Sequence, residues 1–161
     1  MQKTIKTLAE LETEAARFVS RLAPKDASAT LVTLSGELGA GKTAFTKAVA
    51  RVLGVEEIVN SPTFVLEKIY LLPRELGGET PKFVRLIHID AYRLEKGTDL
   101  VPLGFDELMR DAKNLILLEW PENVSDVLPE PAMKISFVVH QDGSPSTKSD
   151  LVLGSRTITY D

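Results

Sequence analysis

The chain has 161 residues, of which 43% are hydrophobic and 26% charged, and these values are typical of one globular domain spanning residues 1–161. No apolar run approaches the roughly 18 residues of a membrane span, and the N-terminus lacks the long apolar segment of a secretory signal. The net charge of -4 disfavours direct binding to RNA or DNA, whereas the absence of cysteine excludes disulfides and zinc–thiolate sites and favours a cytoplasmic location without membrane contact.

The first part of the chain alternates between helical and strand patterns. Apolar residues at helical spacing predict a helix over 8–22, which begins at a capping box formed by Thr7 and Glu10. The apolar run ATLVTL predicts a buried strand over 29–34. A second helix is expected over 42–53, since Gly54 follows as a typical C-terminal signal.

The second part of the chain is predicted to be rich in strands. Loops are expected around Pro62 and over residues 73–82, where PRELGGETPK is typical of a hairpin loop. A short helix is expected over 103–112. Strands are predicted over 64–72, 83–89, 114–119, 132–140 and 150–160. The order of these elements predicts a three-layer α/β fold with a mixed, mainly parallel sheet and a late antiparallel strand pair.

Residues 36–43 read GELGAGKT and fill every position of the phosphate-binding loop pattern Gly-x-x-x-x-Gly-Lys-Thr. A strand before the loop and a helix after it are the context that such a loop requires, so the fold class is that of a P-loop NTPase. Lys42 is expected to reach the β- and γ-phosphates of ATP, and the Thr43 hydroxyl to ligate Mg²⁺. The residues of this segment predicted to contact the nucleotide are Gly36, Glu37, Leu38, Gly39, Ala40, Gly41, Lys42, Thr43 and Ala44.

Two carboxylates compete for the metal ion that a phosphate-binding loop needs. Asp90 ends the run LIHID and Glu119 ends the run LILLE, so both are expected at the carboxyl edge of the sheet. Which of them ligates Mg²⁺ directly stays open at this point. Lys42, Asp90 and Glu119 are the predicted catalytic residues, and Thr43, Asp90 and Glu119 are the predicted metal ligands.

Four further residues have a functional or a purely structural interpretation. Thr63 can close over the γ-phosphate or stabilise a turn, and Trp120 can contact the nucleotide or a partner or simply pack. His88 is by default a structural histidine, on the other side of the sheet from its apolar neighbours. Arg93 can stabilise phosphate charge or form a surface ion pair. Thr63 and Trp120 complete the set of residues predicted to contact the nucleotide.

The class of P-loop protein is narrowed by motifs that the sequence lacks. Neither the Asn-Lys-x-Asp guanine signature nor the Asp-x-x-Gly switch occurs, which favours ATP over GTP. Residues 95–114 contain only three cations, too few for the Arg-bearing lid of a small-molecule kinase. The favoured hypothesis is therefore a compact ATPase that works with a partner. A small-metabolite kinase and a nucleotide-gated binding module with negligible turnover are the alternatives.

Four sequence blocks carry a family resemblance. GELGAGKT, then SPTF at 61–64, HIDAYRL at 88–94 and LLEWPE at 117–122 occur in this order, and the sequence resembles the TsaE family over nearly its whole length. The resemblance implies an ATP- and Mg²⁺-binding protein that associates with the TsaB–TsaD complex. That complex transfers a threonylcarbamoyl group to a tRNA adenosine next to the anticodon, so tRNA is reached only indirectly.

The resemblance also implies roles for individual residues. Glu119 would be a Mg²⁺ ligand, and Asp90 would lie close by and orient water or the metal shell. Thr63 would belong to a switch-like loop, and Trp120 would neighbour the nucleotide or the partner. ATP hydrolysis would reset the complex between catalytic cycles. No motif in the sequence marks the adenine pocket.

Overall fold

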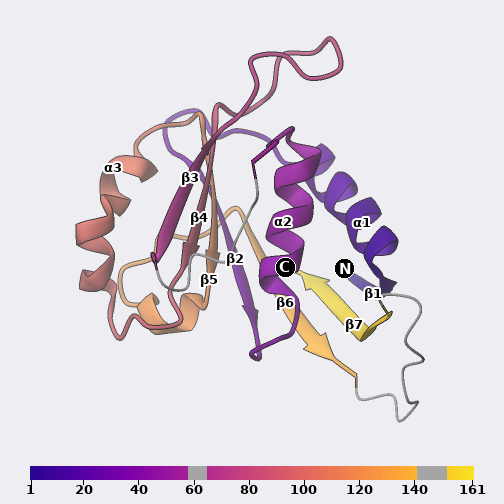
Figure 1. The fold of residues 1–161 in the computed structure, drawn as a ribbon. Helices are drawn as coiled ribbons and strands as arrows, with labels where there is room; N and C mark the ends of the chain where they lie inside the picture. The colour runs from indigo at the N-terminus through magenta and orange to yellow at the C-terminus, as the bar shows by residue number, and fades with distance from the viewer. Residues whose placement is uncertain (58–64, 141–151) are drawn as a thin grey trace.

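The computed structural model describes residues 1–57, 65–140 and 152–161, and within them seven strands form one sheet with helices on both faces (Figure 1). The strand order is β1-β7-β6-β2-β5-β4-β3. Strands β4, β5, β2 and β6 pair in parallel, whereas β3, β7 and β1 each pair with a neighbour in the antiparallel sense. The predicted three-layer α/β fold with a mixed sheet and a late antiparallel pair is confirmed.

The bounds of most predicted elements agree with the sequence patterns to within a few residues. The strands are β1 Gln2–Thr7, β2 Thr30–Gly36, β3 Glu67–Leu71, β4 Arg85–Asp90, β5 Asn114–Glu119, β6 Met133–Val139 and β7 Val152–Tyr160. The α-helices are α1 Leu8–Arg21, α2 Lys42–Val52 and α3 Phe105–Met109, and the short 3-10 helices are η1 Gly97–Leu103 and η2 Pro121–Val124.

The start of α1 is held by side chains of its first turn. The Thr7 hydroxyl accepts a hydrogen bond from the Glu10 backbone N–H at 3.2 Å, as the predicted capping box requires. The Glu10 carboxylate, however, accepts from the Lys6 N–H at 2.6 Å rather than from Thr7. Because β1 runs directly into α1, the Glu10 carboxylate reaches the backbone N–H of Lys6, the residue before the N-cap Thr7.

The sheet separates two hydrophobic clusters. Because side chains alternate along a strand, Leu115 and Leu117 of β5 face the cluster under α1 and α2, whereas Ile116 and Leu118 face the cluster under α3. In Figure 1, α1 and α2 cover one face of the sheet and α3 lies on the other. His88 shares the parity of the buried Leu86, so its side chain lies on the α2 face, opposite the face of Ile87.

The structure shortens one predicted helix and adds one strand that was not predicted. The helix expected over 103–112 is present as the shorter α3, which begins after Gly104; this glycine adopts the left-handed conformation, with φ of 69°, and separates α3 from the preceding η1. The strand β1 was not predicted, since Ile5 is its only buried residue and the alternation is weak. Within the described residues, the strand predicted over 64–72 is shortened to β3. It begins after Leu66, whose φ of 67° is not that of a strand.

The segment between β3 and β4 forms the hairpin connection that the sequence predicted. Leu76 and Glu79 exchange backbone hydrogen bonds of 2.9 and 3.1 Å around Gly77 and Gly78, both with positive φ. This two-residue turn matches the right-handed twist of paired strands. The connection projects from the end of the strands opposite to the end that carries the loop between β2 and α2 (Figure 1).

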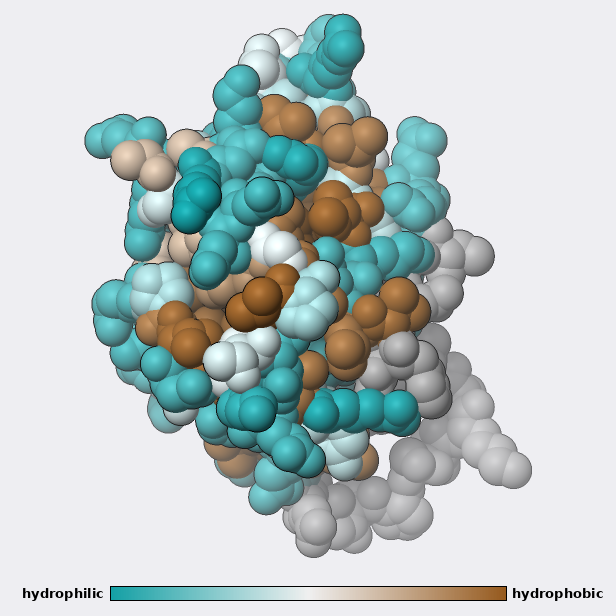
Figure 2. Space-filling view, turned by 90° about the vertical axis from the view of Figure 1, so that its left-hand side faces the viewer, coloured by the Kyte–Doolittle hydropathy of each residue, from teal (hydrophilic) through white to brown (hydrophobic). Residues whose placement is uncertain are grey.

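The surface that carries α3 and β3 mixes hydrophilic and hydrophobic side chains. Figure 2 shows the hydrophobic groups on this face as separate areas among hydrophilic ones. Ile69 and Leu71 of the edge strand β3 are among the exposed apolar residues. Among the described residues, none of the helices combines the length and the apolar character needed to cross a membrane.

Candidate nucleotide-binding site

The loop between β2 and α2 has the conformation of a phosphate cradle. Gly36, Gly39 and Gly41 have φ values of 140°, 77° and 108°, which side-chain-bearing residues rarely adopt. A Cβ atom at Gly36 would lie 2.6 Å from the Phe137 backbone oxygen, so only glycine fits there. The loop leads directly into the first turn of α2, whose free N–H groups and dipole favour an anion.

The two predicted carboxylates lie side by side at the carboxyl edge of the sheet. Asp90 ends β4 and Glu119 ends β5, and the parallel pairing places them in register. Glu119 is also in register with Leu34 of β2, just before the loop. Both acids are almost fully buried, with 4% of Asp90 and 2% of Glu119 exposed. The Asp90 carboxylate accepts a hydrogen bond from the Tyr92 N–H at 3.0 Å.

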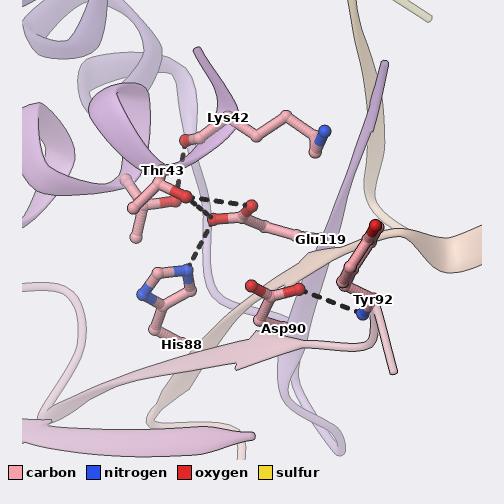
Figure 3. A network of polar contacts seen from close by, with 7 residues as sticks. Lys42, Thr43, His88, Asp90, Tyr92 and Glu119 are labelled. Atoms are coloured by element: carbon pink, nitrogen blue, oxygen red, sulfur yellow. Dashed lines mark hydrogen bonds and ion pairs between the residues drawn. The ribbon is translucent and has the colours of Figure 1, made fainter. Parts of the chain in front are cut away.

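Glu119 joins the loop to the sheet through two polar partners. The Thr43 hydroxyl donates to its carboxylate, with Oγ1 at 3.0 and 3.1 Å from the two oxygens. His88 Nε2 lies 2.7 Å from Glu119 Oε1, and because a carboxylate accepts, the ring nitrogen donates. Figure 3 shows Glu119 between Thr43 and His88, with Asp90 beside them. His88 therefore has a structural role, in agreement with its default interpretation. That role is to orient Glu119, a candidate metal ligand.

Lys42 is held by the loop itself. Its ammonium group donates to the backbone oxygens of Gly36 at 2.6 Å and Glu37 at 3.0 Å, and lies 3.9 Å from the centroid of the Trp120 ring. Burial lowers the pKa of Lys42, and the negative charges of Glu119, Glu122 and Asp90 act in the opposite direction. The lysine ammonium group therefore lies in a partly dehydrated position, where the negative charge of a phosphate would stabilise its protonated form.

Trp120 packs and also covers the lysine. Its backbone is in the left-handed region, with φ of 59° and ψ of 51°, a conformation that costs a non-glycine residue about 1–3 kcal/mol. A hydrogen bond from its N–H to the Leu34 oxygen at 3.1 Å supports this turn. Its ring lies 5.1 Å from that of Tyr92, whose backbone oxygen accepts from the Asn123 amide at 3.2 Å.

One cavity of about 340 Å³ brings the predicted residues together. Its lining residues are Leu38, Gly39, Ala40, Gly41, Lys42, Thr43, Ala44, Asp90, Tyr92, Glu119, Trp120 and Arg156. Gly36 and Glu37, which were also predicted to contact the nucleotide, are absent from this lining, and their backbone oxygens accept from Lys42. Thr63 lies outside the described residues, and Arg93 is absent from the lining. Arg156 comes from the last strand, where no sequence motif indicated a site residue.

Comparison with known proteins shows the family of the chain. The family model described as "Threonylcarbamoyl adenosine biosynthesis protein TsaE" matches residues 5–147. The chain belongs to the TsaE family. The resemblance predicted from the four sequence blocks is therefore confirmed, and the matched residues include every predicted site residue.

Relatives of the TsaE family match over most of the chain. The Rickettsia prowazekii tRNA threonylcarbamoyladenosine biosynthesis protein TsaE is 34% identical over 137 residues, covering 84% of this chain and 85% of the relative. The Streptomyces coelicolor protein of the same name is 40% identical over 116 residues, 71% of this chain and 72% of the relative. The crystal structure of Bacillus subtilis YdiB superposes with a TM-score of 0.69 at 26% identity, covering 99% of this chain and 83% of YdiB. The P-loop fold is thus shared with a solved structure.

Proposed function

We propose that this TsaE-family chain, as a single domain over residues 1–161, is a Mg²⁺-dependent ATP hydrolase. The observation that carries the proposal is the contact of the Thr43 hydroxyl, at the end of the phosphate-binding loop, with the buried Glu119 carboxylate at 3.0 Å. In P-loop proteins the loop Thr and a strand-end carboxylate together serve the metal. Lys42 lies in the same cavity, where it can meet the phosphates.

The residues present fit a nucleotide with Mg²⁺. Thr43, Glu119 and Asp90 offer only oxygen donors, which Mg²⁺ prefers. Among residues 1–57, 65–140 and 152–161, no three His, Cys, Asp or Glu side chains converge to hold a metal ion by themselves. A metal ion here would therefore take ligands from Thr43 and from the nucleotide as well as from a carboxylate. Bound Mg²⁺ would supply positive charge that offsets the charge of the transferred phosphoryl group.

The protein's own side chains would bind the phosphates, orient water and exclude solvent. Lys42 would bind the β- and γ-phosphates from its position over the Gly36 and Glu37 oxygens. Asp90, in register with Glu119 and nearly buried, would orient water or the metal shell. Trp120 would shield Lys42 from solvent and so strengthen its interaction with phosphate. Thr63 would close over the γ-phosphate.

The biological role follows from the family. The proposed partners are TsaB and TsaD, whose complex modifies a tRNA adenosine next to the anticodon with a threonylcarbamoyl group. ATP hydrolysis by this chain would reset that complex between cycles in the cytoplasm. Contact with tRNA would be indirect, in keeping with the net charge of -4. ATP is preferred to GTP because the guanine signature does not occur in the sequence.

Steady-state ATPase rates with and without purified TsaB–TsaD test this proposal. We expect weak Mg²⁺-dependent hydrolysis by the wild-type chain alone and stimulation by the complex. Glu119→Gln should lower the stimulated rate roughly 100-fold, because the amide keeps the hydrogen-bonding shape but removes the negative charge from the metal site. Exposed Glu107 in α3 provides the matched control, and Glu107→Gln should leave the rate unchanged.

Equal rates for wild type and Glu119→Gln would refute the catalytic assignment. Phosphate transfer to a hydroxyl acceptor instead of water would favour the kinase alternative. Tight ATP binding with negligible turnover, even with TsaB–TsaD present, would favour the nucleotide-gated binding module.

A further inference from the structure

The last strand of the chain returns to the phosphate-binding loop. Strand β7 runs antiparallel to β6, and Arg156 at the middle of β7 is in register with Val139 at the end of β6. On the other edge of β6, Phe137 is in register with Gly36, where the loop begins. Arg156 therefore approaches the loop from the β6 side, whereas Asp90 and Glu119 approach it from the β5 and β4 side. The two sets of charges flank the loop from opposite directions.

The Arg156 side chain lies against the loop backbone. Its Nη2 donates to the Gly39 oxygen at 3.3 Å. A Cβ atom built on Gly41 would lie 3.3 Å from both Cδ and Nε of Arg156, so the side chain packs closely over this glycine. Arg156 also lines the cavity that holds Lys42 and Thr43. The loop glycine thus makes room for the arginine as well as for a nucleotide.

The guanidinium group is only partly satisfied. Nε and Nη1 are buried, and neither has a hydrogen-bond partner among the described residues. Burial lowers the pKa of Arg156, yet an arginine stays protonated in proteins. A buried cation whose donors lack partners is costly unless an anion pairs with it, and a guanidinium matches phosphate oxygens with two parallel N–H groups.

We propose that Arg156 is a phosphate-binding residue that contacts the polyphosphate chain of the nucleotide on the flank of the loop opposite the metal carboxylates. This inference rests on the proposed function, because it assigns a ligand to the same cavity. Arg156 and Lys42 would then hold the phosphates from two directions. Lys42 is already paired with the Gly36 and Glu37 oxygens, whereas Arg156 has donors to offer.

Two ligands that share only their phosphates separate this role from the alternatives. The dissociation constants of ATP and of inorganic tripolyphosphate would be measured by calorimetry for wild type and for Arg156→Met. Methionine keeps an unbranched apolar stem against Gly41 but removes the charge and the donors. We expect both ligands to bind roughly 10- to 100-fold more weakly to the variant, the range for hydrogen bonds to a charged group. Because Arg156 lies away from the carboxylates, the same loss should appear with and without Mg²⁺.

The control is Arg74→Met, in the exposed β3–β4 connection at the opposite edge of the sheet, which should bind both ligands as wild type does. Wild-type affinity in Arg156→Met would show that the arginine merely packs against the loop. Weaker ATP binding with unchanged tripolyphosphate binding would place Arg156 on the nucleoside, and either result overturns the inference while leaving the proposed function intact. Failure of the wild type to bind either ligand would overturn both.

Discussion

His88 and Glu119 form a buried polar pair next to the Thr43 hydroxyl, within the proposed metal site. His88 is fully buried, and its hydrogen bond to Glu119 leaves the carboxylate joined to the β4 strand on one side and to Thr43 on the other. Outer partners of a metal ligand fix its orientation and are often nearly as important as the ligand. The pair thus links the packing of the sheet to the chemistry of the loop.

Replacing His88 should weaken the metal site while sparing the fold. In His88→Ala, Glu119 Oε1 loses its donor, so we expect the Mg²⁺ concentration for half-maximal ATPase activity to rise roughly 10-fold. His88→Gln offers an amide donor and should recover part of the loss. The chain's other histidine, His140, is exposed and serves as the control, because His140→Ala should leave the Mg²⁺ dependence unaltered. An unchanged Mg²⁺ dependence in His88→Ala would show that the histidine only fills space.

At the scale of elements, the position of the phosphate-binding loop depends on the strand beside it. Gly36 ends β2 and lies so close to β6 that no side chain fits between it and the Phe137 oxygen. This contact sets the direction in which the chain leaves the sheet. The loop glycines therefore serve two distinct purposes, close strand packing at Gly36 and close approach of Arg156 at Gly41.

Gly36→Ala should be markedly destabilising. The substitution combines a strained φ of 140° with a contact of 2.6 Å to backbone, and we expect the free energy of unfolding to fall by about 3 kcal/mol or more. Gly77→Ala is the control, because Gly77 has a φ of 60° and open space around it, and should cost only about 1–2 kcal/mol. Urea unfolding followed by circular dichroism measures both. Equal losses in the two variants would contradict the packing argument.

At the scale of the whole molecule, the two ends of the chain meet in the sheet. The N-terminal amino group of Met1 donates to the Tyr160 oxygen at 2.9 Å, and β1 pairs with β7 along most of its length (Figure 1). Strand β7 in turn carries Arg156 to the cavity. The same strand therefore joins β1 to the rest of the sheet and supplies Arg156 to the cavity.

Binding of Mg·ATP should stabilise the entire fold. A ligand at 100 times its dissociation constant contributes about 2.7 kcal/mol, which for a chain of this length raises Tm by about 5–10 °C. Lys42→Ala should abolish this shift, because the cavity would lose the cation proposed to bind the β- and γ-phosphates. Mg·GTP at the same concentration should give a smaller shift than Mg·ATP. Differential scanning calorimetry tests these expectations, and an equal shift in the Lys42→Ala variant would contradict them.

Short-range patterns in the sequence were sufficient for the outline of the fold and the centre of the site. GELGAGKT is contiguous, and the runs that end in Asp90 and Glu119 indicate strands by themselves, so their meeting at one edge follows from parallel pairing. By contrast, β1 and the division between η1 and α3 depend on a single buried residue and a single glycine conformation. Such weak local signals are decided by tertiary packing.

The sequence by itself therefore predicted a phosphate-binding loop, the order of most elements, and two acids at the carboxyl ends of neighbouring strands. Only the tertiary structure decided which side chains complete them, because those contacts join residues far apart along the chain. Thr43 and Glu119 are 76 residues apart, and Gly39 and Arg156 are 117 apart. His88 and Arg156 reach the site through strand register, which no local spacing encodes, since it arises only when the sheet buries its two faces.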